Sequence, residues 1–461
     1  MRRLTWILVI VTMGLWGQPA AAQSGLGGLL STITQSLNSL TQNQQQGVIV
    51  RTSLGLNGLL NLCLFQGCTV VGSLDGGANQ LFLVKPVQGL LPNLLASVLR
   101  LIPGILNAEV DAVITIPPAP ETQVVAPIPP AGLWDNHALN YFGSPVWNGY
   151  AVQPAAQIIR VAQAQYAFHV SGAGIVADID TGVDPNHPAL QGVLLPGYDF
   201  TRDRPGGSEM ADLAPTSTTA CNPCQPAFVN QHTAAMLDQH TAAMVDGTGY
   251  AAFGHGTEVM GVIHLVAPTA QLLPLKSFHP DGTGNLSDIL SALYYAVQNK
   301  ADVINMSFDL STNSQELSNA INNATSHGVI CIASAGNDGA QEIVYPAALQ
   351  GVMGVASTNN FDQRSSWSNY GNQIVWVAAP GENIITTYPF GTYAASSGTS
   401  FSAPFVSGTA ALLVDLQSNV NQSGASSAIA HAKWIGPSMG NGRLDVFSAL
   451  AALNQSQGWN H

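Results

Sequence analysis

The sequence has little charge, and most of that charge is negative. Only 8% of its 461 residues are Asp, Glu, Lys or Arg, and 26 acidic residues outnumber 13 Lys and Arg, for a formal net charge of −13. A nucleic-acid-binding protein needs a basic face, so this composition argues against nucleic acid as a partner. Hydrophobic residues make up 46% of the chain. That share excludes general disorder and supplies a large core, and the length suggests two or three domains.

The sequence also lacks an apolar run long enough to cross a bilayer. Leu4–Trp16 spans about 13 residues, whereas a membrane-spanning helix needs about 20. A basic pair, Arg2–Arg3, precedes this run, and small residues ending at Ala22 follow it. This order is typical of a secretory signal peptide. We therefore expect residues 1–22 to be a signal peptide and the product to be secreted or periplasmic, with no membrane span.

The sequence has only five cysteines, an odd number. Cys63 lies close to Cys68 in the sequence, and Cys221 lies close to Cys224. An exported chain favours two local disulfides, although the second pair also fits half of a zinc site. Cys331 stands in an apolar run and is expected to be a buried free thiol.

The first half of the chain divides by composition. Residues 23–47 are rich in Ser, Gly, Asn and Gln and are interpreted as a flexible leader, and the proline-rich residues 117–145 as an exposed linker. Between them, residues 48–116 carry short apolar segments that alternate between strand and helix patterns. We expect a small α+β domain of split βαβ type with the order β-α-β-β-α-β. Its elements are predicted at Val48–Arg51, Leu56–Phe65, Thr69–Ser73, Gln80–Lys85, Leu91–Ile102 and Val110–Ile116.

From residue 146 to residue 456, apolar strand-like runs alternate with helical patterns. Such continuous apolar strands are typical of a mainly parallel sheet with helices on both faces, an α/β fold. The predicted strands are Gly174–Ile179, Gln271–Lys276, Ala301–Asn305 and Val329–Ala333, and the predicted helices include Ser287–Gln298 and Ser314–His327.

The region 201–253 contains a short tandem duplication. The octapeptide that begins at Gln231 recurs almost unchanged from Gln239. Two copies are too few for a solenoid, so we interpret the region as a surface insertion. A metal site is the alternative, formed by the four polar side chains of the repeat, which are His232, Asp238, His240 and Asp246.

Three short segments carry the residues of a hydrolytic triad. Asp180 ends an apolar strand, His255 stands in Gly-His-Gly-Thr, and Ser400 stands in Gly-Thr-Ser before a helical run. A serine hydroxyl becomes nucleophilic when an imidazole removes its proton, and a carboxylate on the other ring nitrogen fixes the tautomer of that imidazole. The chain order Asp, His, Ser is one of the known orders of such triads.

A stabiliser for the developing oxyanion is also present. Ser400 is predicted at a helix N-terminus, where backbone N–H groups face outward. Asn337 follows an apolar strand in Ala-Gly-Asn-Asp-Gly, and its side-chain amide supplies a second donor.

With these segments in their order, the chain resembles the subtilisin-like serine endopeptidases from near Val146 to about Ala452. The resemblance rests on six motifs: Asp180-Thr-Gly, Gly254-His-Gly-Thr, Asp281-Gly-Thr-Gly, Ala301-Asp-Val-Ile-Asn-Met-Ser307, Ala335-Gly-Asn and Gly398-Thr-Ser-Phe-Ser-Ala-Pro404. It implies that Asp180, His255 and Ser400 are the triad and Asn337 the oxyanion donor, with protein or peptide substrates. It also implies that residues 48–116 are a pro-domain that inhibits the protease until it is cut away.

The same resemblance implies a set of substrate-binding residues. They are Ser307, Phe308, Asp309, Ala335 and Gly336. Asp309 stands where the family usually has glycine, and it is expected to favour basic substrates over acidic ones. The family's calcium loop is shortened here, so no cofactor is expected, and the sequence does not itself show a calcium site.

Two acidic residues depart from the family pattern near the triad. Asp178 precedes Asp180 by two residues on the same face of a strand, and Glu258 follows His255 by three on the same face of a helix. One hypothesis is that they share a proton or hydrogen bonds with the triad and shift activity towards acidic pH. The alternative is a structural role away from the triad.

Three alternatives compete with a subtilisin-like serine endopeptidase. A catalytically silent binding protein of the cell envelope requires the loss of a triad residue, and none is lost. A lipase-like hydrolase requires a Gly-x-Ser-x-Gly elbow, which does not coincide with Ser400. A sedolisin-type acid peptidase uses glutamate in place of histidine. The intact His255 argues against this alternative, whereas Glu258 keeps it open.

Overall fold

The computed structural model describes residues 46–116, 130–213 and 251–457, which form two compact units. The first unit contains the described residues up to Ser73 together with Asn79–Asp111. The second contains Leu74–Ala78 and the described residues from Ala112 onward. Residues 23–45 of the predicted leader, the octapeptide repeat, and Cys221 with Cys224 lie outside the described residues.

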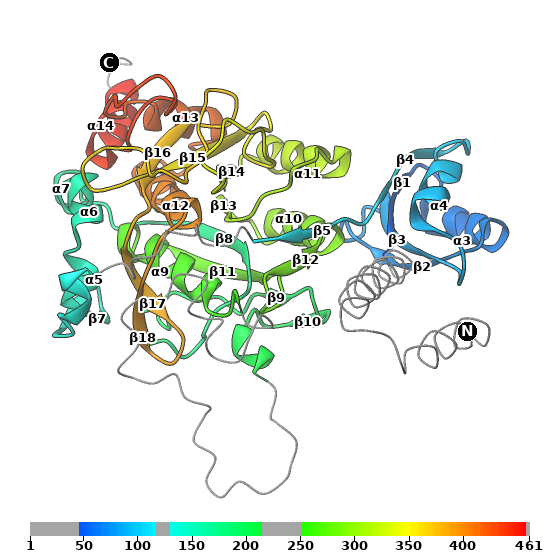
Figure 1. Ribbon diagram of the computed structural model, residues 1–461, viewed down its shortest axis with the longest axis horizontal. Coiled ribbons are helices and arrows are strands. Elements are labelled where there is room, and N and C mark those ends of the chain that lie inside the picture. The colour runs from blue at the N-terminus through cyan, green and yellow to red at the C-terminus, as the bar shows by residue number, and fades with distance from the viewer. Residues whose placement is uncertain (1–45, 117–129, 214–250, 458–461) are drawn as a thin grey trace, which may run out of the picture. The chain divides into compact units, whose positions relative to one another are not determined.

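The first unit is a four-stranded antiparallel sheet with two helices (Figure 1). Its elements follow the predicted order: β1 (Val48–Thr52), α3 (Gly55–Gln66), β2 (Cys68–Ser73), β3 (Leu81–Pro86), α4 (Pro92–Leu99) and β4 (Ile105–Val110). The spatial strand order is β2-β3-β1-β4. Alternate residues of the strands, such as Val48 and Val50, pack against Leu59, Leu95 and Leu99 of the helices. Cys63 and Cys68 form the predicted disulfide.

The last strand of this unit was predicted in the wrong place. The fourth strand is β4, which ends at Val110, and not Val110–Ile116. The β-branched run after Asp111 does form a strand, β5 (Val113–Thr115), but β5 pairs with β12 (Thr283–Asn285) in the second unit. The β-branched residues of this run favour a strand, but strand propensity does not identify the partner strand.

The second unit is built on an eight-stranded sheet (Figure 1). In spatial order its strands are β10 (Arg204–Pro205), β9 (Tyr198–Asp199), β11 (Gln271–Lys276), β8 (Ile175–Asp180), β13 (Val303–Met306), β14 (Ile330–Ser334), β15 (Val352–Thr358) and β16 (Val377–Pro380). All neighbouring pairs are parallel except β10 with β9. The predicted mainly parallel α/β fold is therefore confirmed. Cys331 lies in β14 as a buried free thiol.

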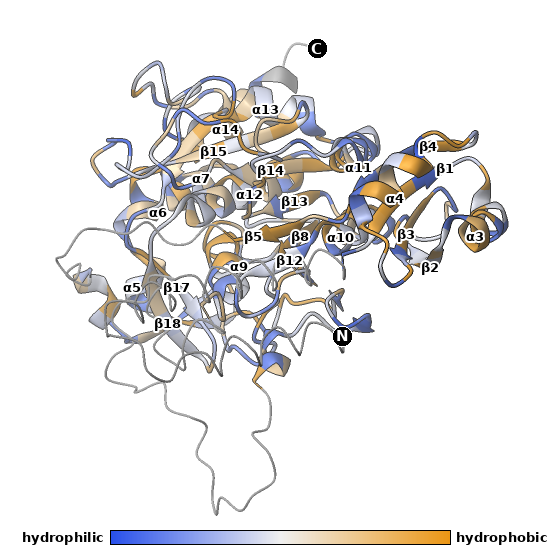
Figure 2. Cartoon of the chain, turned by 45° about the vertical axis from the view of Figure 1, so that its right-hand side comes forward, coloured by the Kyte–Doolittle hydropathy of each residue, from blue (hydrophilic) through white to orange (hydrophobic). Residues whose placement is uncertain are grey.

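Helices cover both faces of this sheet, as Figure 1 shows. On one face, α9 (His255–Val266) and α12 (Thr399–Leu416) contact each other, and α13 (Gln422–Ile429) and α14 (Val446–Gln457) lie beyond α12. On the other face, α10 (Leu286–Gln298) contacts α11 (Gln315–Ser326). Figure 2 shows hydrophobic residues in the central strands β8 and β13. Both α9 and the first 16 residues of α12 are buried all round, as expected of helices in the core of a large domain.

The second unit begins earlier than the sequence predicted. Within the expected linker 117–145, the described part forms η1 (Ala131–Trp134), β6 (Ala138–Tyr141) and the start of β7 (Ser144–Trp147). Three short helices follow: α5 (Asn148–Ala151), α6 (Pro154–Ile158) and α7 (Val161–Phe168). A hairpin of β17 (Ile384–Tyr388) and β18 (Thr392–Ser396) contacts α9. Within the described ranges, no helix is both long and apolar enough to cross a membrane.

Candidate active site

Asp180 lies at the carboxyl end of β8, a central strand of the parallel sheet. Its side chain is 1% exposed, and Oδ1 accepts a hydrogen bond of 2.6 Å from the backbone N–H of Thr181. The chain turns at Gly182, whose φ is 102°. A Cβ on Gly256 would lie 2.0 Å from the Gly182 carbonyl oxygen. Only glycine at this position allows the turn after Asp180 to contact the first turn of α9.

His255 is the first residue of α9 and makes the predicted pair with Asp180. Its Nδ1 lies 2.7 Å from Asp180 Oδ1 and 2.9 Å from Oδ2. Because an ionised carboxylate only accepts, Nδ1 carries the hydrogen and Nε2 keeps its lone pair. Nε2 is buried and has no hydrogen-bond partner among the residues that the structure describes. A buried base with a free lone pair can accept a proton from a nucleophile.

Ser400 is the second residue of α12, at the helix N-terminus as predicted. Pro404 lacks an N–H, so the Ser400 carbonyl has no intrahelical donor and accepts instead from Ser307 Oγ at 3.1 Å. Ser400 Oγ faces the Ser307 carbonyl oxygen at 3.4 Å. The next residue, Phe401, places its ring centroid 5.6 Å from that of His255. The fold thus brings the start of α12 beside the imidazole, with the hydroxyl turned towards Ser307.

Asn337 follows β14 and is held against the start of α12. Its Oδ1 accepts hydrogen bonds from Thr399 N at 3.0 Å and from Thr399 Oγ1 at 2.9 Å. Because both bonds use the oxygen of the amide, the Nδ2 donor is left for another acceptor. A Cβ on Gly398 would lie 3.6 Å from Nδ2, so the amide donor is beside the turn that leads into Ser400.

The predicted substrate-binding residues form two neighbouring segments. The Ser307 hydroxyl donates its hydrogen bond to the Ser400 carbonyl. Phe308 is fully buried, with its ring centroid 5.2 Å from that of Phe278. Asp309 is half-buried, and a Cβ on Gly336 would lie 3.0 Å from its Oδ2. Burial, with the nearby carboxylates of Asp338 and Glu342, raises the pKa of Asp309 to about 7. Ala335 is fully buried.

One strand of the chain itself reaches Asp309. Strand β5 pairs antiparallel with β12 and forms a bridge from Thr115 to Asp309. The backbone N–H of Ile116 donates to the Gly282 carbonyl at 2.9 Å. A peptide in extended form is therefore held by backbone hydrogen bonds between β12 and Asp309.

The two additional acids have partners outside the triad. Asp178 Oδ1 accepts from Asn305 Nδ2 at 2.9 Å, and Glu258 Oε1 accepts a short hydrogen bond from Ser396 Oγ. Neither is hydrogen-bonded to Asp180 or His255, so the shared proton that we hypothesised has no direct contact to support it. Burial raises the pKa of both Asp178 and Glu258 well above the usual range, and the charge of Asp180 adds to this.

A third buried acid, Glu209, was missed by the sequence analysis. It lies in η2 (Glu209–Asp212) and bonds to the residues that flank Asp180 and His255. Burial raises its pKa to about 8, against the lowering by its hydrogen bonds and by Lys276. Lys276 was also missed, although a lysine at the end of the apolar run Leu272–Leu275 was a signal that a buried partner exists.

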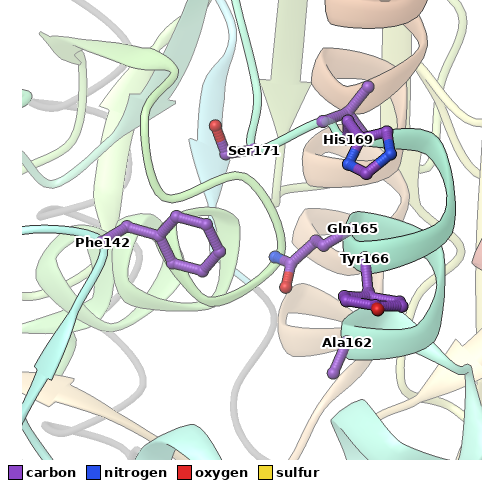
Figure 3. Close-up of a pocket in the computed structure, with 7 residues that line it drawn as sticks. Phe142, Ala162, Gln165, Tyr166, His169 and Ser171 are labelled. Carbon is purple, nitrogen blue, oxygen red and sulfur yellow. The ribbon is translucent and has the colours of Figure 1, made fainter.

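A separate pocket of about 450 Å³ lies beside α7, between Phe142 and Ser171 (Figure 3). Ala162, Gln165, Tyr166 and His169 contribute to its wall, and the triad residues do not. Across the described ranges, no group of three His, Cys, Asp or Glu side chains could hold a metal ion. The histidines and aspartates of the octapeptide repeat are outside those ranges.

Comparison with known proteins adds to this geometry. The model of the subtilase family matches residues 172–459. A thermophilic serine proteinase of Bacillus sp. (strain AK1) is 34% identical over 238 residues, which are 52% of this chain and 51% of that protein. Subtilisin BL of Lederbergia lenta is 41% identical over 35% of this chain and 62% of its own length. Thermitase of Thermoactinomyces vulgaris is 34% identical over 57% of this chain and 81% of its own.

The chain thus spans about half to three-fifths of the length of the first two relatives. The crystal structure of a lanthipeptide protease shares the fold, with a TM-score of 0.50, 22% identity, and coverage of 66% of this chain and 96% of that one. The family model alone covers well over half of the chain, including Asp180, His255, Asn337 and Ser400. The chain therefore belongs to the subtilase family.

Proposed function

We propose that the protein is a secreted serine endopeptidase that hydrolyses peptide bonds through an acyl-enzyme on Ser400. The observation that carries the proposal is the Asp180–His255 pair, at 2.7 Å, with the free Nε2 of His255 beside the N-terminus of α12. Family membership and the serine proteinases among the relatives support the same chemistry. Export rests on the signal-peptide pattern of residues 1–22.

The reaction begins with a turn of the Ser400 hydroxyl from Ser307 towards His255 Nε2. His255 takes the hydroxyl proton as Oγ attacks the carbonyl carbon, and Asp180 stabilises the imidazolium that results. The oxyanion is held by Asn337 Nδ2 and by the backbone N–H of Ser400. Such a donor contributes roughly a hundred- to a thousand-fold in rate. His255 then gives its proton to the leaving amine, and water repeats the sequence to release the acyl group.

Strand β5 supports peptides as the substrate class. A substrate in the place of β5 would pair with β12 and with Asp309 through its main chain, which recognises any extended peptide. Side chains at alternate positions of that peptide would then determine preference.

Labelling with a serine-directed phosphonylating probe tests the proposal. We expect the probe to label the mature protein at Ser400, identified by mass spectrometry of the labelled peptide, and not to label Ser400→Ala. Ser402, two residues along α12, provides the matched control, and Ser402→Ala is expected to retain labelling. Labelling that survives Ser400→Ala would place the nucleophile elsewhere. No labelling of the wild-type protein would favour a catalytically silent binding protein.

Preference for basic substrates is expected to depend on pH through Asp309. Because its pKa is raised to about 7, Asp309 is neutral below that pH and negative above it. The ratio of kcat/KM for a lysine-containing peptide to that for its norleucine analogue should therefore rise between pH 6 and pH 8. Asp309→Asn should make the ratio independent of pH. Glu342→Gln removes one exposed negative neighbour and should move the rise to lower pH, whereas an unchanged rise in Asp309→Asn would contradict the role of this residue.

A further inference from the structure

A fully buried carboxylate connects the two segments that carry Asp180 and His255. Glu209 is 0% exposed, and its Oε2 accepts from Thr181 Oγ1 at 3.0 Å and from the backbone N–H of Gly254 at 2.8 Å. Its Oε1 accepts a short hydrogen bond from Thr257 Oγ1. Thr181 directly follows Asp180, and Gly254 directly precedes His255. All three donors are therefore within two residues of the catalytic pair.

The hydroxyl groups of Thr181 and Thr257 also accept hydrogen bonds from the backbone. Thr181 Oγ1 already accepts from the backbone N–H of Gly256 at 2.9 Å, and Thr257 Oγ1 accepts from that of Asp184 at 2.7 Å. Because ionised Glu209 can only accept, each hydroxyl then donates its own hydrogen to it. A carboxylate can accept all three hydrogen bonds, whereas an amide of the same size would turn its NH₂ group towards at least one donor.

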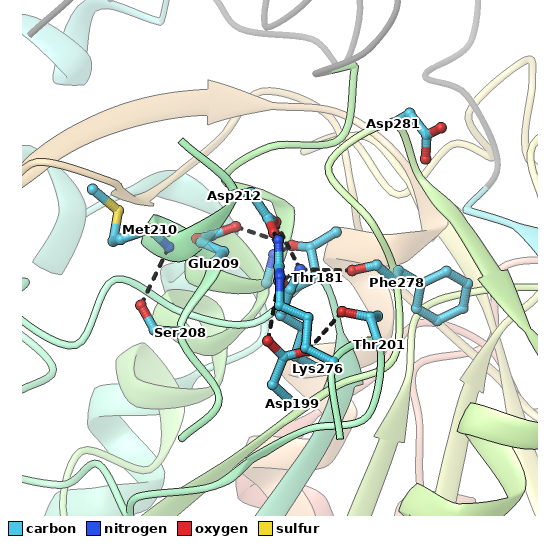
Figure 4. A network of polar contacts seen from close by, with 12 residues as sticks. Thr181, Asp199, Thr201, Ser208, Glu209, Met210, Asp212, Lys276, Phe278 and Asp281 are labelled. Atoms are coloured by element: carbon cyan, nitrogen blue, oxygen red, sulfur yellow. Dashed lines mark hydrogen bonds and ion pairs between the residues drawn. The ribbon is translucent and has the colours of Figure 1, made fainter. Parts of the chain in front are cut away.

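A buried cation contacts the same turn (Figure 4). Lys276 is 0% exposed, and its Nζ donates to the Thr181 carbonyl at 2.8 Å and to Asp212 Oδ2 at 2.7 Å. Arg202 in turn pairs with Asp212. The Thr181 hydroxyl and carbonyl are thus held by two different buried side chains, Glu209 and Lys276. A chain with 13 Lys and Arg buries one of them at this turn, although burying a charge is costly unless it is paired.

From this arrangement we infer that Glu209 is a positioning residue, which sets the distance and angle between Asp180 and His255 through Thr181, Gly254 and Thr257. It contacts neither substrate nor reacting atoms. The inference rests on the proposed function in that the consequence of this positioning is catalytic. A displacement of about 1 Å in such a pair costs up to about a hundred-fold in rate.

Kinetics of Glu209→Gln at pH 9 test the inference, because Glu209 is ionised in the wild-type protein at that pH. We expect kcat to fall about ten- to a hundred-fold with KM changed by less than two-fold. Thr181→Val, which removes the hydroxyl at constant size, should give a similar loss, and Thr181→Ser should restore the rate. The double variant Glu209→Gln with Thr181→Val should have a kcat little lower than that of either single variant. Both substitutions disrupt the same hydrogen bond, between Thr181 Oγ1 and Glu209.

Gln153→Ala separates positioning from stability. Gln153 is 3% exposed and bonds to the backbone of Ile385 at 3.0 Å and 2.6 Å, so its loss should lower the melting temperature without lowering kcat. A Glu209→Gln protein that is destabilised to the same degree but keeps full kcat would overturn the inference. So would fully additive losses in the double variant.

A spectroscopic measurement keeps this result distinct from failure of the proposed function. In Glu209→Gln, the proton resonance of the His255 Nδ1–H bonded to Asp180 is expected to shift by NMR, and in Gln153→Ala it is expected to stay in place. A wild-type protein without peptidase activity or probe labelling would refute the proposed function while this resonance still reports on Glu209. An unshifted resonance in Glu209→Gln would refute the positioning role even in an active enzyme.

Discussion

Replacing His255 by alanine is expected to lower kcat by about a million-fold, and adding Ser400→Ala is expected to cost almost nothing more. We expect the two residues to act as one unit, because the hydroxyl is nucleophilic only when the imidazole takes its proton, and a subtilisin behaves in this way. Initial rates on a peptide anilide, measured for the wild type, both single variants and the double variant, complete the cycle. KM should change far less than kcat, because neither side chain binds the ground-state peptide.

This double-mutant cycle addresses the orientation of Ser400 directly. In the structure its Oγ lies 3.4 Å from the Ser307 carbonyl, and His255 Nε2 has no partner among the described residues. If the hydroxyl turns to His255 during the reaction, the two single variants and the double variant will lose kcat by about the same factor. Independent losses that multiply in the double variant would show that Ser400 and His255 do not act together. His327→Ala, at an exposed histidine at the end of α11, is the matched control and should keep the wild-type rate.

The places of Asp180, His255 and Ser400 in the fold could be predicted because each residue stands where local pattern and sheet topology agree. An apolar run that ends in Asp180 predicts a buried parallel strand. A glycine on each side of His255 predicts that the start of helix α9 packs closely against neighbouring backbone. The carboxyl ends of parallel strands lie along one edge of the sheet, so residues 75 and 145 positions apart in sequence meet there. Gly256 is one of those glycines, and a side chain there would collide with the Gly182 carbonyl.

Residues that act through tertiary partners were not predictable in this way. Glu209 lies in a short 3₁₀ turn with no periodic pattern, and its three donors come from two distant segments. The partner of β5 was missed for a similar reason, since a β-branched run specifies a strand but not its neighbour. Lys276 could have been found, because a lysine in an apolar strand must be paired when buried.

The second large effect is expected in maturation: Ser400→Ala protein should accumulate as the precursor without its signal peptide. We propose that the first unit is an inhibitory pro-domain and that the chain cuts itself between Ile116 and Val146. Strand β5 supports this, because it already lies along β12 and Asp309 and leads into Pro117. A tethered strand is present at high effective concentration, so it occupies the site until the connection is cut.

Expression in a host without other secreted proteases tests this maturation step. N-terminal sequencing of the wild-type product should give a chain that starts between residues 117 and 146, whereas Ser400→Ala should start at about Gln23. His327→Ala, at an exposed residue outside the site, should still be processed and serves as the control. Processing of Ser400→Ala to the mature start would refute self-cleavage and leave the triad assignment in place. Conversion of purified Ser400→Ala by added active enzyme would show cleavage between molecules, because the linker is then cut by a second copy and not by the site that its own β5 strand occupies.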